Sequence, residues 1–91
     1  MQEENRMKEF SYVITDAEGL HARPAGELVK KASTYACDVK ISKNGREVDA
    51  KRIMGVMSLG VKCGMEVTVK TDGEGEDVAI EELKAFFETN L

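Results

Sequence analysis

The only histidine in the chain, His21, lies in a short segment with residue types that could carry a phosphoryl group. This segment reads GLHARPA at residues 19–25. From residue 22 on, apolar residues recur every three or four positions, which is typical of a helix with one buried face. Pro24 fits the first turn of that helix, where its missing N–H is not needed. The segment therefore predicts that a helix begins directly after His21, with the imidazole beside unpaired main-chain N–H groups.

This placement suits a nucleophile that accepts a phosphoryl group. The positive end of the helix dipole favours the neutral imidazole, in which one ring nitrogen is free to attack phosphorus. The N–H groups can bind phosphate oxygens, and the guanidinium of Arg23 matches them as well. Glu18 adds a carboxylate near the same place, which would either repel the bound group or help to expel it onward. An isolated histidine at a helix start is more often a cap or a solvated surface residue, so these residues alone raise phosphoryl transfer only as a hypothesis.

The segment resembles the active-site signature of the histidine-containing phosphocarrier protein (HPr) family of the bacterial phosphotransferase system. A second segment, KRIMGVMSLG at residues 51–60, resembles the second signature of that family, at the family's distance from the first. The resemblance runs over nearly the whole chain. It implies that His21 accepts a phosphoryl group on Nδ1 from Enzyme I and passes it to the A-domains of sugar permeases. It also implies that Ala22, Arg23 and Pro24 surround the phosphate and that Arg23 takes part in the transfer.

The resemblance further implies a docking surface for these partners. In the family, the helix that carries the second signature meets both the phosphoryl donor and the acceptors, together with the first helix. The residues expected to contact partners are Leu20, Ile53, Met54 and Met57. Methionine suits several partners because its flexible thioether repacks easily, although the two methionines could instead fill gaps in the core.

Arg52 departs from the family pattern. In many relatives from Gram-positive bacteria the matching residue is a serine, which a dedicated kinase phosphorylates to couple the carrier to catabolite repression. Arginine has no hydroxyl group to modify and is a poor helix N-cap. Serine-linked regulation is therefore not expected in this chain, whereas the histidine chemistry is intact.

The remaining sequence predicts the elements that hold these residues in place. Alternating apolar and polar residues predict strands over residues 9–15, 38–43, 46–49 and 66–71. Apolar residues at helical spacing predict helices over residues 22–34, 53–59 and 76–90. Asn44 and Gly45 predict a type I′ hairpin turn, because both residues accept a positive φ. The order β-α-β-β-α-β-α predicts an α+β fold, a two-layer open-faced sandwich whose four-stranded antiparallel sheet carries three helices on one face.

The length of 91 residues fits one small domain with a single core. Residues 1–6 are polar and show no apolar period, so we expect a disordered extension or a cloning remnant there and an HPr-like domain over residues 7–91. The net charge of −4, without a basic cluster, argues against nucleic acid as a partner. No apolar run reaches membrane-spanning length and the first residues show no signal-peptide pattern, so we expect neither a membrane span nor a secretory leader. We expect a cytoplasmic monomer.

The cysteines and the single histidine indicate no cofactor. Cys37 and Cys63 are far apart and form no C-x-x-C pair, so free thiols are expected and a metal site is not. The predicted protein is a carrier with a transient phosphohistidine and not an enzyme in its own right. Two alternatives stay open: an HPr-like paralogue in another phosphorelay, such as one linked to a dihydroxyacetone kinase or to nitrogen metabolism, and a regulatory protein-binding module.

Overall fold

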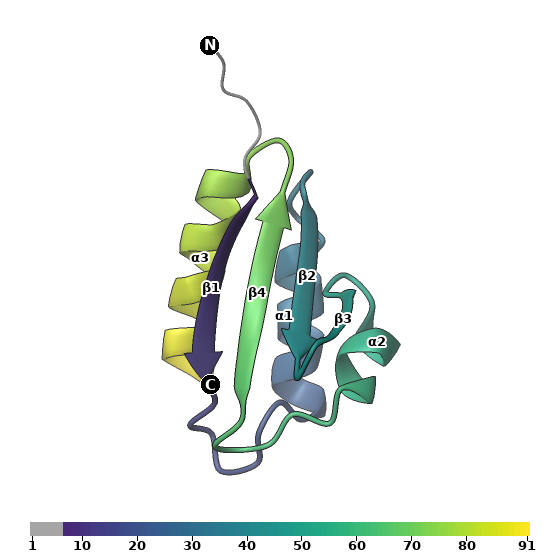
Figure 1. Ribbon diagram of the computed structural model, residues 1–91, viewed down its shortest axis with the longest axis vertical. Coiled ribbons are helices and arrows are strands. Elements are labelled where there is room, and N and C mark those ends of the chain that lie inside the picture. The colour runs from purple at the N-terminus through teal and green to yellow at the C-terminus, as the bar shows by residue number, and fades with distance from the viewer. Residues whose placement is uncertain (1–6) are drawn as a thin grey trace.

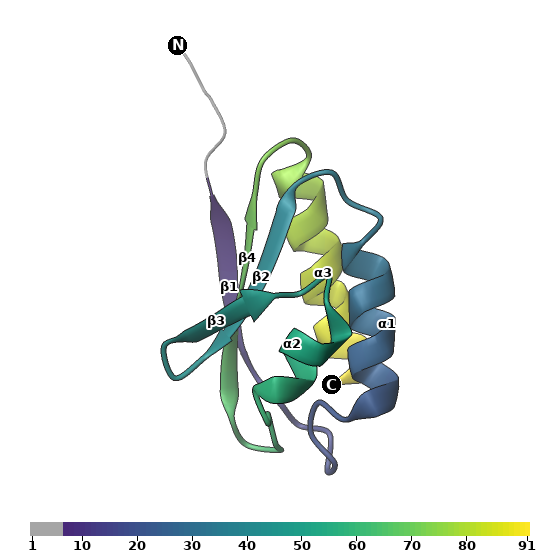
Figure 2. The ribbon, with the colours of Figure 1, turned by 90° about the vertical axis from the view of Figure 1, so that its right-hand side faces the viewer.

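The structure, a computed structural model, describes residues 7–91, so the expectation about residues 1–6 lies outside the described residues. Seven elements follow one another in the predicted order. They are β1 (Lys8–Val13), α1 (Ala22–Ala32), β2 (Asp38–Lys43), β3 (Arg46–Asp49), α2 (Ile53–Ser58), β4 (Glu66–Asp72) and α3 (Glu76–Asn90). The predicted fold class is confirmed, since the four strands form one antiparallel sheet and the helices form a second layer (Figures 1 and 2).

The sheet has the strand order β1-β4-β2-β3, so the last strand lies between the first two (Figure 1). Its inner face is apolar because alternate residues of each strand point toward the helices. Ile41 and Val69 are register partners in the centre and are fully buried. The turn between β2 and β3 has φ values of 52° at Asn44 and 85° at Gly45, which confirms the prediction of a turn with two positive φ angles.

The helices α1 and α3 lie against the same face of the sheet, and α2 lies beside α1 (Figure 2). Leu28 of α1 and Leu83 of α3 are completely buried in this layer. Phe87 of α3 is also completely buried, and its ring meets Phe10 and Tyr12 edge to face at centroid distances of 5.5 and 5.7 Å. These contacts fix the C-terminal end of α3 against β1.

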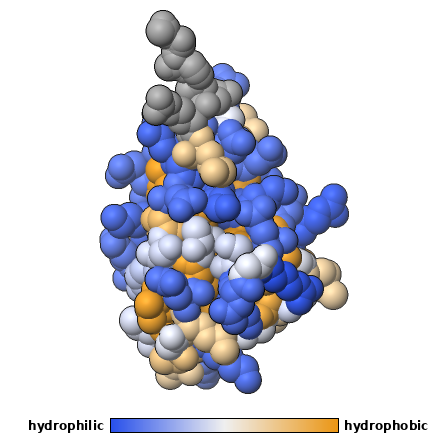
Figure 3. All heavy atoms as spheres, in the orientation of Figure 1, coloured by the Kyte–Doolittle hydropathy of each residue, from blue (hydrophilic) through white to orange (hydrophobic). Residues whose placement is uncertain are grey.

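The other face of the sheet has no helix on it and is mostly hydrophilic (Figure 3). Lys70 of β4 and Glu47 of β3 form an ion pair there, with 3.4 Å between Nζ and Oε2. Within residues 7–91, no helix is both long enough and apolar enough to cross a membrane.

The predicted bounds differ from the observed ones only at a few ends. β1 stops at Val13 and not at residue 15, because Thr15 leaves the sheet and donates its amide to Leu91 O. α1 stops at Ala32 and not at residue 34, since Thr34 turns back and donates both its amide and its hydroxyl to Lys31 O. Side-chain and loop contacts of this kind end an element without leaving a periodic signal in the sequence.

Candidate functional site

His21 is the N-cap residue of α1, as the sequence predicts. Its backbone is extended, with φ −86° and ψ −174°, and its carbonyl oxygen accepts the first helical hydrogen bond from Ala25 N at 2.9 Å. Its side chain makes no capping hydrogen bond. The ring is 37% exposed, so it is held at the surface with room for an approaching group.

Gly19 explains how the chain turns sharply before the histidine. Its φ is +71°, and a Cβ atom placed on it would lie 2.5 Å from Val61 O and 2.6 Å from Lys62 Cα. Next to it, Leu20 donates its amide to the same Val61 oxygen at 3.0 Å. A side chain at position 19 is therefore excluded both by backbone conformation and by the loop that follows α2.

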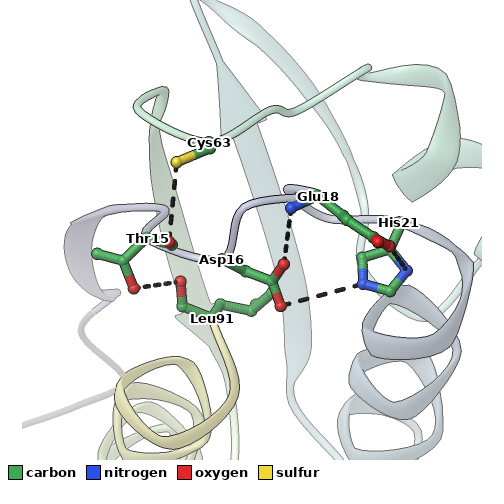
Figure 4. Close-up of polar contacts among 6 residues, drawn as sticks. All are labelled: Thr15, Asp16, Glu18, His21, Cys63 and Leu91. Atoms are coloured by element: carbon green, nitrogen blue, oxygen red, sulfur yellow. Dashed lines mark hydrogen bonds and ion pairs between the residues drawn. The ribbon is translucent and has the colours of Figure 1, made fainter.

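Two carboxylates bracket the imidazole (Figure 4). Asp16 Oδ2 lies 4.0 Å from His21 Nε2, and Glu18 Oε1 lies 3.6 Å from Nδ1. Both distances exceed a hydrogen bond, so the contacts are electrostatic and leave the ring nitrogens available. The second oxygen of Asp16, Oδ1, accepts a hydrogen bond from Glu18 N at 2.8 Å, which fixes the turn between the two acids.

The same loop is fastened to the end of α3 (Figure 4). The main-chain oxygen of Leu91 accepts hydrogen bonds from Thr15 N, from Thr15 Oγ1 at 2.9 Å and from Asp16 N at 2.8 Å. Leu91 itself is buried, with its amide bonded to Phe87 O at 2.8 Å. Across the loop, Cys63 Sγ lies 3.7 Å from Thr15 O.

Arg23 lies on the same open depression as the histidine ring. This depression has a volume of about 220 Å³. Its lining residues are Asp16, His21, Arg23, Pro24, Glu27 and Asn90. Ala22 and Arg23 are the first exposed residues of α1, and the first N–H groups of a helix have no acceptor within it, whereas Pro24 is buried and has no N–H. The arrangement can hold a tetrahedral anion beside an imidazole, in a shallow site open to a partner protein.

No metal centre accompanies this site in the part of the chain that the structure describes. No three histidine, cysteine, aspartate or glutamate side chains among residues 7–91 converge as ligands. The depression presents an imidazole and a guanidinium beside a helix N-terminus.

A second exposed surface lies on α2. The side chains of Ile53, Met54 and Met57 are 39%, 79% and 39% exposed, so the two methionines do not fill the core. Beside them, an open hollow is lined by Val29, Lys51, Arg52, Ile53, Met54 and Gly55. Leu20 requires a correction: it is only 5% exposed and packs in the core, because its amide bond to the neighbouring loop draws it inward. Its side chain therefore lies apart from the exposed apolar side chains of α2.

Arg52 is the N-cap residue of α2 and makes no side-chain capping bond, in keeping with its poor capping ability. The side chain is 81% exposed and points its Nε toward Asp49 Oδ2 at 4.0 Å. No hydroxyl group stands at this helix start.

Sequence reasoning missed the contribution of Asp16, Thr15 and Leu91. Asp16 is an ordinary turn residue in the sequence, and only its position three residues before Gly19 hints at a turn. Leu91 is 76 positions away from Thr15, and nothing in the sequence announces that pairing. The position of Asp16 and the pairing of Thr15 with Leu91 both follow from the packing of α3 on the sheet.

Comparisons with known proteins agree with this geometry. The family model for the HPr component phosphorylation site of the phosphotransferase system matches residues 8–89. The phosphocarrier protein HPr of Mycoplasma capricolum is 44% identical over 78 residues, which cover 86% of this chain and 88% of that protein. A crystal structure of HPr from Thermoanaerobacter tengcongensis superposes with a TM-score of 0.86 at 40% identity, covering 90% of this chain and 92% of the other.

A third similar protein is Crh of Bacillus subtilis, described as a catabolite repression protein. It is 44% identical, with a TM-score of 0.73, and the match covers 82% of this chain and 86% of that one. Its crystal structure is a domain-swapped, intertwined dimer.

Proposed function

The chain belongs to the HPr family of the phosphotransferase system, and on this premise we propose that it is a phosphocarrier with His21 as its phosphoryl acceptor. One observation carries the proposal: the His21 ring stands open at the start of α1, with no capping bond, on the same depression as Arg23. A nucleophile, a guanidinium and helical N–H groups together match the oxygens of a transferring phosphoryl group.

In the proposed transfer, one P–N bond forms as another breaks, and no cofactor is needed. The lone pair of His21 Nδ1 attacks the phosphorus of a phosphohistidine on the donor protein. The P–N bond on the donor side breaks, and its electron pair stays on the donor's ring. Arg23 and the N–H groups of Ala22 and Arg23 stabilise the charge on the phosphoryl oxygens during the transfer, and Pro24 fixes the helix start that aims them. In the second transfer, a nucleophile of the acceptor attacks the phosphorus, and the P–N bond to His21 breaks with its electron pair staying on the His21 ring.

The partners in this proposal are an Enzyme I-type donor and the A-domains of sugar permeases, met in turn in the cytoplasm. The open site supports this, because each partner must reach the same ring. The exposed side chains of Ile53, Met54 and Met57 supply the apolar contact area. The carrier acts as a monomer in this scheme, although its relative Crh forms a swapped dimer.

Arg52 separates this chain from a regulatory role through serine phosphorylation. The start of α2 offers a guanidinium and no hydroxyl group, so a serine kinase has nothing to modify there. A regulatory module is therefore the weaker alternative. A carrier for a different phosphorelay would use the same residues, and the identity of the donor distinguishes it.

The proposal is tested by incubating the protein with phosphoenolpyruvate and a bacterial Enzyme I. We expect one acid-labile phosphate on the wild-type protein and none on His21→Ala, with both proteins giving the same circular dichroism spectrum. Label that persists in His21→Ala would show that another residue is the acceptor. A wild-type protein that takes label only from the donor of another relay would assign it to that relay.

A further inference from the structure

The carboxylates of Asp16 and Glu18 stand at opposite nitrogens of the His21 ring. We propose that Asp16 is a positioning residue that holds the proton on Nε2, while Glu18 destabilises the phosphoryl group on Nδ1 and so promotes its onward transfer. This inference rests on the proposed function, because it concerns the same ring. It assigns a role to two acids that the transfer scheme itself does not use.

Asp16 is well placed to favour one tautomer of the His21 ring. Its amide is fixed to Leu91 O at 2.8 Å and its Oδ1 accepts from Glu18 N at 2.8 Å, so only Oδ2 is left to face the ring. Its side chain is 30% exposed, which makes it the more enclosed of the two acids. A carboxylate opposite Nε2 favours a proton on that nitrogen. Glu18 Oε1 lies closer to Nδ1, at 3.6 Å, but its side chain is 76% exposed, so solvent screens its attraction for a proton more strongly than that of the more enclosed Asp16. The lone pair then lies on Nδ1, where the proposed attack takes place.

Asp16 also suits the phosphorylated ring. When Nδ1 carries the phosphoryl group, a proton on the ring can lie only on Nε2, which faces Asp16 Oδ2 at 4.0 Å. The negative charge of Asp16 stabilises that N–H. The same contact therefore supports the ring before and after it accepts the group.

Glu18 lies on the Nδ1 side of the ring, across from Asp16. Its Oε1 is 3.6 Å from Nδ1, which is the place that the phosphoryl oxygens would take. Its side chain is 76% exposed, so it can swing aside when the group arrives, but its charge stays nearby and repels the phosphoryl dianion. Of the other charged groups on the depression, Arg23 attracts the dianion and Glu27 adds to the repulsion.

An exchange equilibrium tests the two halves of the proposal. Phosphorylated wild-type protein is mixed with an unphosphorylated variant and a trace of Enzyme I, and the share of phosphate on each is measured at equilibrium. For Glu18→Gln we expect the variant to hold about two- to tenfold more phosphate than wild type, and for Asp16→Asn about two- to tenfold less. The effect of Glu18→Gln should shrink at 1 M salt, where charges are screened within about 3 Å. The matched control is Glu81→Gln, an exposed acid on α3, with equal shares expected.

A second measurement separates positioning from general loss of structure. In Asp16→Asn, the new amide group keeps an oxygen that can accept from Glu18 N, so the loop keeps its bond and only the charge is lost. Nitrogen-15 spectra of unphosphorylated protein labelled in His21 should show the neutral ring with its proton on Nε2 in wild type and a larger share on Nδ1 in the variant.

The outcomes are distinct. Equal shares in both exchange experiments, or a ring with its proton mainly on Nδ1 in wild type, would overturn this inference while leaving the carrier function intact. If wild-type protein accepts no phosphate from any donor, the proposed function fails, and the nitrogen-15 spectra still decide whether Asp16 sets the proton position.

Discussion

The amide of Leu20 donates a hydrogen bond to the carbonyl oxygen of Val61 at 3.0 Å, and this bond joins the loop before α1 to the loop after α2. The first signature-like segment is thus tied by its backbone to the residue that directly follows the second. Gly19 permits the contact, because a side chain there would overlap the second loop. The position of the histidine is therefore set from outside its own helix.

Gly19→Ala should lower the free energy of unfolding by about 2–4 kcal/mol, from the left-handed backbone conformation and the overlap with Val61 O together. Gly60→Ala is the matched control. Gly60 also has a positive φ of 62°, but open space surrounds its Cβ position, so only about 1 kcal/mol is expected. Urea unfolding of both variants measures the difference. Equal losses would show that the neighbouring loop yields easily.

Arg23→Ala should slow phosphoryl transfer from Enzyme I by about tenfold or more, because one cationic contact to the transferring oxygens is lost. Arg23 is exposed, so the unfolding midpoint should not change. Rapid-quench measurement of the transfer rate checks this. Lys84→Ala removes an exposed positive charge from α3 and should leave the rate unaltered. A wild-type rate in Arg23→Ala would remove Arg23 from the mechanism.

Met54→Ala should weaken binding to Enzyme I about tenfold, or about 1.4 kcal/mol, if the exposed face of α2 is a contact surface. The side chain is 79% exposed, so its loss should cost the free protein little stability. Val78→Ala on α3 removes another exposed apolar side chain, which is 59% exposed, and serves as the control. Titration calorimetry gives both affinities. An equal affinity for the two variants would place the interface elsewhere.

The two thiols should differ sharply in reactivity. Burial raises the pKa of the Cys37 thiol, which is 2% exposed, whereas Cys63 is exposed. At pH 8, iodoacetamide should therefore modify Cys63 quickly and Cys37 only after unfolding, because the thiolate is the reactive form. Mass spectrometry of timed samples counts the modifications, and Cys63→Ser should remove the fast one. Rapid modification of Cys37 in that variant would mean that its surroundings open readily.

Stability should fall in alkaline solution because of Tyr35. Burial raises the pKa of its hydroxyl, and the hydrogen bond to Glu82 Oε1 at 2.6 Å raises it further. Above pH about 10 the unfolded chain releases this proton while the folded protein retains it, so the free energy of unfolding decreases as pH rises. Tyr35→Phe should show a smaller decrease between about pH 9 and about pH 11 in urea unfolding. The same decrease in both proteins would assign the alkaline loss to other groups.

Local patterns predict most of this fold. The alternation in β2 and the Asn44-Gly45 turn are properties of adjacent residues, and the observed bounds of β2, β3 and α3 equal the predicted ones. The place of His21 at a helix start follows in the same way from Pro24 and the apolar spacing. Such features depend on backbone preferences that each short segment carries by itself.

The surroundings of the histidine depend on contacts between distant segments, and these leave no local pattern. Leu20 is bonded by its amide to Val61 O, and its side chain is buried although the sequence alone presents it as a surface contact. The approach of Asp16 to the ring needs the turn that its own Oδ1 forms with Glu18. Only the assembled layers bring these groups together.

The last turn of α3 has a consequence for the histidine loop. Thr15 and Asp16 both depend on one oxygen, that of Leu91, and helix ends fray more easily than helix centres. Unravelling of a single turn at this end would release three hydrogen bonds of the loop while the sheet stayed paired. Amide hydrogen exchange at Thr15 and Asp16 should thus follow the opening of a helix end that lies 76 positions from Thr15 in the sequence, at a lower free energy than global unfolding.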